Sequence, residues 1–181
     1  MAPHIALHEI GVPFESRPIS LAKKENRTAA FLALNPEGKV PLLLIDGRPL
    51  TEVAAILFYL AKAFPDAGLL SQGDLEAQAQ VVSWMSFVAS TVHPARRQGA
   101  DHARAAYAIA ERRLGSREWA VGLYSIADIH LFRLFWRFSN SLELSRTEFP
   151  NLFAHYDRMM ARPAVQRTLE IEKSVGYELP A

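Results

Sequence analysis

Residues 35–56 constrain the fold of this 181-residue chain more than any other segment. An apolar run at residues 40–45 leads into the pair Asp46-Gly47, and residues 48–51 form a short run after it. Asp-Gly between two such runs is typical of a tight β-hairpin turn. Pro41 cannot donate a hydrogen bond to a neighbouring strand, so it favours the start or the edge of the first strand. The segment therefore predicts a strand, a tight turn and a second strand.

A helix start follows the hairpin directly. Thr51 stands where the N-cap of a helix is expected, and Glu52 follows in the first turn, where the helix dipole favours a carboxylate. The start of a helix offers unpaired N–H groups to an anionic group, and the carboxylate of Glu52 can bind a cationic one. An amino-acid head group carries both charges. These residues therefore predict a binding site for a molecule with a free α-amino group and a free α-carboxylate.

The same segment resembles the glutathione-binding half of the cytosolic glutathione S-transferases, in particular the bacterial beta-like members. The family pattern N-P-x-G-x-V-P-x-L appears at residues 35–43. The pattern L-T-E-[SG]-x-A-I appears at residues 50–56, with Val53 in place of Ser or Gly. The resemblance implies glutathione as the cofactor, a cis peptide before Pro41, and strand-like pairing of the Val40 backbone with glutathione.

Further glutathione contacts are implied by the resemblance. Glu52 and the backbone N–H of Val53 are expected to bind the γ-glutamyl group, without the hydroxyl contact that Ser would add. Lys24 matches a position where beta-like relatives place a lysine on the glycyl carboxylate, and a solvated lysine is the alternative. Ser86 and Ser90 lie one helical turn apart and are expected to face the glutathione of a neighbouring subunit, with surface serines as the alternative.

His93 is the candidate catalytic residue. The segment at residues 90–94, S-T-V-H-P, resembles a segment of beta-like transferases in which the histidine approaches the sulfur of glutathione. A capping or packing histidine near a helix end is the alternative. No metal site is expected, because His4 and His8 share a helix face but have no third ligand at a suitable spacing.

The resemblance covers nearly the whole chain and implies an α/β domain followed by an all-α domain. We expect a thioredoxin-like domain at residues 1–64 that lacks its first strand, and a helical domain of the glutathione-transferase type at residues 75–181. The linker between them, residues 65–74, is punctuated by Pro and Gly. In the first domain we expect helices at residues 2–10 and 26–34 and strands at residues 14–21 and 40–46. In the second, apolar periodicity predicts helices at residues 75–92, 102–114 and 125–138, and the resemblance implies a closing helix at residues 151–162.

The start of the chain departs from the family. Members begin with a short central strand and a loop that carries the catalytic Tyr, Ser or Cys. Here Met1 directly precedes the expected first helix. We therefore expect the natural protein to begin upstream of Met1. The chain has no cysteine, so a cysteine nucleophile and disulfides are excluded within these residues.

Composition excludes several classes of partner. Hydrophobic residues make up 50% and charged residues 22% of the chain, which provides material for a core. The net charge is +1 and the basic residues are dispersed, so no nucleic-acid surface is expected. No apolar run approaches the roughly 20 residues of a membrane span, and no signal peptide is visible. The sequence therefore predicts a cytoplasmic protein without a membrane or nucleic-acid partner.

The expected function follows from this inventory. The resemblance implies a homodimer that binds glutathione and transfers or exchanges its thiol with a small hydrophobic electrophile. We expect weak or absent activity in this chain, because the activating hydroxyl or cysteine is missing, although the start of the first helix still favours a thiolate. Two alternatives stay open: a non-enzymatic binding or regulatory module of the same fold, and a glutathione-dependent dehalogenase or isomerase.

Overall fold

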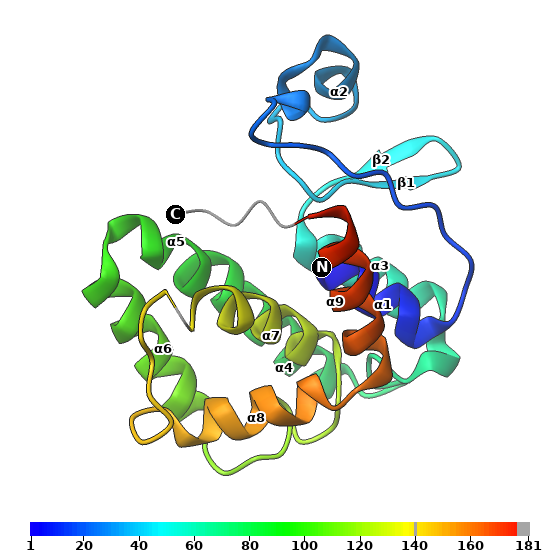
Figure 1. Ribbon diagram of the computed structural model, residues 1–181. Coiled ribbons are helices and arrows are strands. Elements are labelled where there is room, and N and C mark those ends of the chain that lie inside the picture. Colours follow the sequence, from blue (N-terminus) through cyan, green and yellow to red (C-terminus); the bar gives the residue numbers. More distant parts are fainter. Residues whose placement is uncertain (140, 177–181) are drawn as a thin grey trace.

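The computed structural model of the protein describes residues 1–139 and 141–176. It has a small N-terminal part with a two-stranded sheet and a larger helical part (Figure 1). The predicted fold class, an α/β part followed by an all-α part, is confirmed. The domain limits at residues 64 and 74 stay a prediction. The last predicted domain, residues 75–181, includes residue 140 and residues 177–181, which lie outside the described residues.

The predicted hairpin is confirmed, although its strands are short. β1 (Leu43–Ile45) pairs antiparallel with β2 (Arg48–Leu50). Asp46 and Gly47 between them have φ of 50° and 80°. Positive φ at both turn residues gives the tight turn whose twist matches that of paired strands, and Asp and Gly tolerate it. The facing pairs are Leu43 and Leu50, Leu44 and Pro49, and Ile45 and Arg48.

The strand predicted at residues 14–21 is wrong, and the one predicted at residues 40–46 is shortened to β1. Among the described residues, β1 and β2 are the whole sheet. A strand needs a partner for its ladder of hydrogen bonds, and neither residues 14–21 nor residues 40–42 have one. Phe14 instead stacks on His4 of the first helix, with ring centroids 5.6 Å apart. The sheet of this half is therefore a single hairpin.

The helices of the N-terminal part agree with the prediction at α1 and differ at α2. α1 (Ala2–Ile10) ends at Gly11, which takes the left-handed conformation with φ of 79°. Residues 26–34 do not form one helix, because Thr28 is extended and separates η1 (Glu25–Arg27) from α2 (Ala29–Leu34). α3 (Val53–Ala63) follows β2, and the short η2 (Pro65–Ala67) leads to the second part.

The four helices predicted for the second part are confirmed, with small shifts at their ends. α4 (Leu75–Phe87) continues through the π-helical turn η3 (Val88–Val92) into α5 (His93–Ala95). The elements after α5 are η4 (Arg96–Gln98), α6 (Ala100–Leu114), α7 (Ile126–Phe138), α8 (Pro150–Met160) and α9 (Pro163–Val175). None of the helices in the described part of the chain is both long and apolar enough to cross a membrane.

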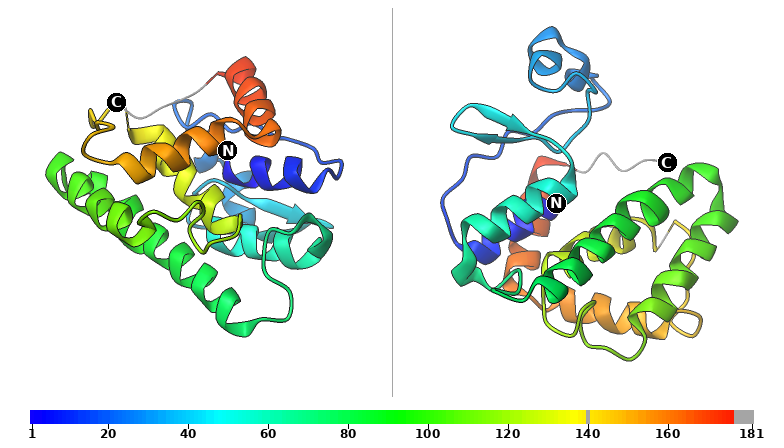
Figure 2. Two further views of the ribbon diagram at one scale, coloured as in Figure 1. Left: turned by 90° about the horizontal axis from the view of Figure 1, so that it is seen from below. Right: turned by 180° about the vertical axis from the view of Figure 1, so that it is seen from behind.

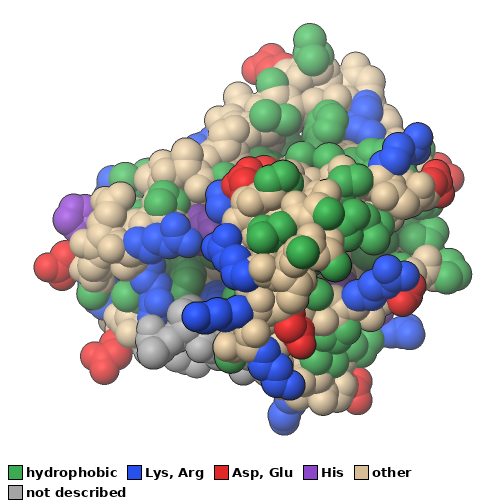
Figure 3. Space-filling view, turned by 90° about the horizontal axis from the view of Figure 1, so that it is seen from above, with side chains coloured by type: hydrophobic (Ala, Val, Ile, Leu, Met, Phe, Trp, Pro, Cys, Tyr) green, Lys and Arg blue, Asp and Glu red, His purple; other side chains and the backbone are tan. Residues whose placement is uncertain are grey.

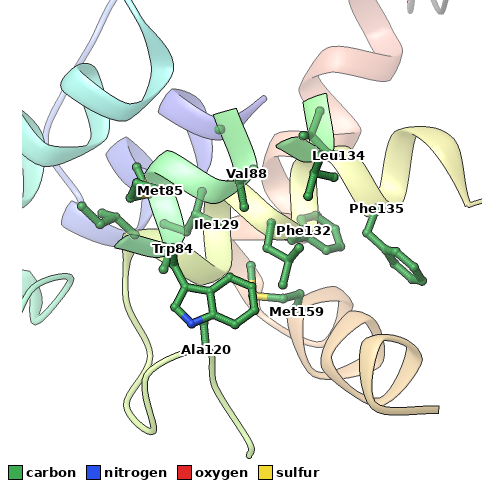
Figure 4. Packing of buried hydrophobic residues seen from close by; sticks show 14 of the residues in the cluster. Trp84, Met85, Val88, Ala120, Ile129, Phe132, Leu134, Phe135 and Met159 are labelled. Atoms are coloured by element: carbon green, nitrogen blue, oxygen red, sulfur yellow. The ribbon is translucent and has the colours of Figure 1, made fainter. Parts of the chain in front are cut away.

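Helix α7 lies in the middle of the hydrophobic core. Ten of its 13 residues are buried, so neighbouring helices cover it on several sides. Its aromatic residues Phe132, Phe135 and Phe138 are buried in this core. Figure 4 shows side chains of α7 beside those of α4 and α8, among them Trp84, Met85, Ile129, Phe132 and Met159.

Helix α1 joins the two parts. It contacts α3 of the first part and also α7 and α9 of the second, and Figure 2 shows it beside α9. Its Ala2, Ile5 and Ala6 have no exposed surface. The start of α1 is therefore fixed against α7 and α9.

Candidate functional site

The loop before β1 is held in one conformation by two asparagines. The buried side chain of Asn35 donates to the carbonyl of Lys39 at 2.8 Å and accepts from the N–H of Glu37 at 3.1 Å. Asn26 donates to the carbonyl of Gly38 at 2.6 Å. Gly38 has φ of 62°, and a Cβ there would lie 2.9 Å from the carbonyl oxygen of Asn26, so only glycine fits. The peptide between Val40 and Pro41 that follows is cis, as predicted.

Glu52 occupies the N-cap of α3, and the prediction of Thr51 as the N-cap is wrong. Glu52 has φ of 67° and ψ of 121°, and its carbonyl accepts from the N–H of Ile56 at 2.9 Å. Its exposed side chain makes no capping hydrogen bond. A side chain other than glycine at positive φ is costly, and such residues concentrate at functional sites. The arrangement presents the carboxylate beside Val53, where the first N–H groups of α3 have no partner inside the helix.

His93 begins α5 at the end of the π-helical turn, on the exposed surface. Partial burial lowers the pKa of its imidazole to about 4, and the charges of Arg133, Arg97, Arg137 and Lys39 act in the same direction. The ring is therefore neutral at pH 7, and it can donate one hydrogen bond and accept another.

Lys39 connects the hairpin side with His93. Its pKa is raised, mainly by the hydrogen bond and ion pair with Glu37, and Glu52 and Arg97 also lie within its electrostatic range. The charge of Lys39 also lowers the pKa of His93. The structure therefore brings Glu52 of the first part and His93 of the second part to the same side of the molecule, with an ammonium group within range of both. Figure 3, a view from above, shows several Lys and Arg side chains close together on the surface.

Ser86 lies on α4 and Ser90 on η3, one helical turn apart. The hydroxyl of Ser90 donates to the carbonyl of Ser86 at 2.8 Å, which satisfies one hydroxyl within the helix itself. Ser86 lines a groove of about 320 Å³ between α3 and α4, whose other lining residues are Ala54, Ala55, Phe58, Val82 and Met85. Their role toward glutathione stays a prediction.

Lys24 is exposed and takes the left-handed conformation, with φ of 56°, before η1. Its side chain has no contact with the other predicted glutathione-binding residues within residues 1–139 and 141–176, and its role also stays a prediction. His4, one of the two histidines considered for a metal, instead lies 2.9 Å from the carboxylate of Glu172 through its Nδ1 atom.

Sequence reasoning missed a polar cluster on α7. His130, Arg133 and Arg137 are spaced three and four residues apart, which places them on one face of a helix that is otherwise mostly apolar. The signal was present in the sequence as three basic residues inside an apolar helix. Only the tertiary structure shows that this face of α7 lies within electrostatic range of His93.

Comparison with known proteins agrees with this geometry. Residues 1–62 match the family model of the glutathione S-transferase N-terminal domain, and residues 75–163 match that of the C-terminal domain. Among curated proteins, the chain is 30% identical to glutathione S-transferase GST-4.5 of Xanthomonas campestris and 32% identical to glutathione S-transferase GstA of Escherichia coli O157:H7. In both cases the match covers 95% of this chain and 93% of the relative.

A solved structure is similar over the same extent. The structure of a glutathione transferase homologue from Sulfitobacter with bound glutathione superposes with a TM-score of 0.87 at 27% identity. The match covers 94% of this chain and 91% of that one. This similarity extends over the hairpin part and the helical part together.

Proposed function

The chain belongs to the glutathione S-transferase family, and on that premise we propose that it binds glutathione along the loop before β1 and at the start of α3. The backbone of Val40, whose residue is 41% exposed, pairs with the cysteinyl part of glutathione. The carboxylate of Glu52 binds the α-amino group, and the N–H of Val53 binds the α-carboxylate of the γ-glutamyl group.

One observation carries this proposal. Glu52 holds a positive φ at the N-cap of α3 and keeps its carboxylate free of capping hydrogen bonds. A carboxylate next to the unpaired N–H groups of a helix start offers partners for both charges of an amino-acid head group. The bound glutathione in the Sulfitobacter homologue supports the same ligand. Lys24, Ser86 and Ser90 are secondary contacts in this proposal.

The reaction we propose is transfer of the glutathione thiol to an electrophile, with low activity in this chain. The thiolate is the nucleophile, and the positive start of α1 favours it over the thiol. His93, neutral at pH 7, supplies a hydrogen-bond donor toward the sulfur. The chain contains no cysteine that would exchange with glutathione, and this keeps a non-enzymatic binding module as the second candidate.

We also propose that the protein is a cytoplasmic homodimer. The groove between α3 and α4 is lined mostly by apolar side chains, and Phe58 and Val82 are 39% and 44% exposed. Exposed apolar residues grouped around a groove are typical of a protein interface. A second copy of the chain that covers this groove removes both side chains from water.

Calorimetric titration with glutathione tests the proposed function, after the intact mass of the protein has been measured. We expect binding at micromolar to millimolar affinity, and a loss of about ten-fold or more in Glu52→Ala, because a charged hydrogen bond contributes roughly 1.5–3 kcal/mol. Glu76→Ala, at an exposed position in the first turn of α4, is the matched control and keeps the wild-type affinity. Equal affinity in all three proteins means that the site is wrong.

Transfer activity toward 1-chloro-2,4-dinitrobenzene then separates the two candidates. Turnover that depends on Glu52 supports the enzyme, whereas binding without turnover toward this and other electrophiles supports the binding module. Profiling haloalkanes and cis–trans isomer pairs in the same assay distinguishes a dehalogenase or an isomerase from a conjugating enzyme.

A further inference from the structure

The inner face of α7 carries a basic cluster that the proposed glutathione site does not use. His130, Arg133 and Arg137 share this face, while their neighbours Leu131, Leu134 and Phe135 are buried in the core. Arginine is rare inside apolar helices because its charge must be hydrated or paired. A cluster of three basic residues in the most buried helix therefore needs an explanation.

Several polar atoms of this cluster lack a partner within the described residues. Both ring nitrogens of His130, which is only 1% exposed, and the hydroxyl of Tyr107 on α6, also 1% exposed, make no hydrogen bond. The same holds for the buried Nε atoms of Arg133 and Arg137. Buried polar groups in native proteins are nearly always hydrogen-bonded, since an unpaired one costs about 1–3 kcal/mol. A group from outside the protein that accepts hydrogen bonds accounts for the donors among these atoms: the two arginine Nε–H groups, the tyrosine hydroxyl and the protonated ring nitrogen of His130.

The surrounding charge is positive. Arg133 stays charged at neutral pH even though burial and Arg137 lower its pKa to about 10, with Tyr107 acting against them. Arg96 and Arg137 both lie over the ring of Phe138, at 4.8 Å and 5.7 Å from its centroid. Burial, Arg133 and His93 lower the pKa of His130, so this ring is neutral.

Acidic side chains compensate this charge only in part. The carboxylate within range of Arg137 is that of Glu172 on α9, and it is already paired with the amino group of Met1 and with His4. Lys39, on the hairpin side, is paired with Glu37. Arg133 has no carboxylate partner in the part of the chain that the structure describes. An anion is therefore the ligand that this cluster favours, and a carboxylate fits the planar fork of a guanidinium in two hydrogen bonds.

We propose that this cluster binds the carboxylate of an anionic electrophile, so that Arg133 and Arg137 select negatively charged substrates for transfer from glutathione. The inference rests on the proposed glutathione site. The charges of Lys39 on the hairpin side and of Arg133 and Arg137 on α7 all lower the pKa of His93. Since His93 is the hydrogen-bond donor toward the sulfur in the proposed function, the cluster lies on the electrophile side of the same site in this inference. Arg133 and Arg137 hold the carboxylate, and the unpaired polar atoms of the buried His130 and Tyr107 provide further hydrogen-bonding groups.

A matched pair of aryl chlorides, 4-chloro-3,5-dinitrobenzoate and its methyl ester, tests the selection. In both, the glutathione sulfur forms a bond to the carbon that bears chlorine, chloride leaves with the bonding electron pair, and the thiol proton passes to solvent. The two differ at the opposite end of the ring, where one carries a carboxylate and the other a neutral methyl ester. Because the ester withdraws electrons more strongly, each kcat/KM is divided by the rate constant of the uncatalysed reaction with glutathione. The corresponding glutathione conjugates, titrated by calorimetry at low ionic strength, report binding independently of turnover.

The wild-type protein is expected to bind the carboxylate conjugate about ten-fold more tightly than the ester conjugate, and to show the same preference in kcat/KM. Arg133→Gln and Arg137→Gln each reduce this ratio toward one and leave the affinity for glutathione unchanged. Arg133→Lys keeps part of the preference because it keeps the charge. Arg112→Gln, exposed on α6, is the control and keeps the whole preference. Thermal melting confirms that each variant is folded, and Arg137→Gln carries the test if Arg133→Gln does not fold.

A ratio of one in the wild-type protein overturns the inference, and so does a ratio that both arginine variants leave unchanged. If the arginine variants weaken glutathione itself by the same factor, the cluster binds glutathione and the inference is also wrong. If the wild-type protein does not bind glutathione at all, the proposed function fails, and 3,5-dinitrobenzoate and its methyl ester then test the cluster alone. Preference for this acid that is lost in Arg137→Gln supports an anion site, and equal binding of acid and ester rejects it.

Discussion

Arg162 donates two hydrogen bonds to the carboxylate of Glu9, from Nε at 2.6 Å and from Nη2 at 3.0 Å. The same carboxylate accepts from the hydroxyl of Tyr124 at 2.9 Å, and the guanidinium of Arg162 lies 3.5 Å from the centre of the Tyr124 ring. These three residues come from α1, from the segment before α7 and from the residue before α9. The network therefore joins α1 to the starts of α7 and α9.

Glu9→Gln is expected to lower the free energy of unfolding by about 2 kcal/mol. The half-buried Arg162 loses its charged partner, and the hydroxyl of Tyr124 donates to a neutral amide oxygen instead of a carboxylate. Urea unfolding followed by circular dichroism measures the change. Glu170→Gln, exposed on α9, serves as the control and changes the free energy by less than about 0.5 kcal/mol. Equal stability of the two variants contradicts a structural role for the network.

Asp128 does more than cap α7. Its carboxylate accepts from the N–H of Ser125 at 2.9 Å in the capping box of α7, and also from the N–H of Ala120 at 2.8 Å. Nε2 of the buried His155 on α8 lies 3.0 Å from the same carboxylate. One fully buried side chain thus fixes the start of α7, the loop before it and α8.

Asp128→Ala is expected to lower the free energy of unfolding by about 3–5 kcal/mol, since it removes a cap and leaves His155 and the N–H of Ala120 without a partner. Denaturant unfolding measures the loss. Asp101→Ala, at an exposed position in the first turn of α6, is the control and costs less than about 1 kcal/mol. A loss of that small size for Asp128→Ala would mean that the carboxylate only caps the helix.

His93 makes the stability depend on pH. Its pKa is lowered to about 4 in the folded protein from an ordinary value of 6.5, so the unfolded chain takes up a proton in this window before the folded protein does. The free energy of unfolding therefore falls as the pH falls from 6.5 to 4. Because the ring is exposed and screened by water, we expect a contribution of about 1 kcal/mol. The buried His130, whose pKa is also lowered, acts in the same direction.

Unfolding free energies at pH 7 and pH 4.5 test this dependence. His93→Asn removes the titrating group, so the variant is expected to lose about 1 kcal/mol less than the wild-type protein on acidification. His102→Asn, exposed on α6, is the control and keeps the wild-type pH dependence. The same dependence in His93→Asn as in the wild-type protein is the result that contradicts the lowered pKa.

The proposed dimer interface can be tested at Val82. A charged side chain in the apolar groove between α3 and α4 has no partner when a second copy covers it, so Val82→Asp is expected to weaken dimerisation by about 100-fold or more. Sedimentation equilibrium measures the dimer fraction. Leu123→Asp is the matched control, because Leu123 is 76% exposed and lies outside this groove. A Val82→Asp variant that dimerises like the wild-type protein places the interface elsewhere.

The sequence by itself determined the local structure of this protein. The Asp46-Gly47 turn, the end of α1 at Gly11 and the capping box of Ser125 and Asp128 all follow from the conformational preferences of a few adjacent residues. Apolar periodicity located three helices of the second part, and the family resemblance located the fourth, at residues 151–162. The motifs at residues 35–43 and 50–56 identified the family, because they match its pattern in a long and specific order of residues that includes Glu52 at the start of a helix.

The tertiary structure decided which of these elements acquire partners. Residues 14–21 have the sequence of a strand but no neighbouring strand, so their backbone stays outside the sheet. Glu52, rather than Thr51, caps α3 because the chain must turn there to leave the hairpin. The basic face of α7 can be interpreted only from the packing, which buries His130 and brings the charge of Arg133 within range of His93. These residues are far apart in the sequence, so the sequence alone does not predict that they lie close together.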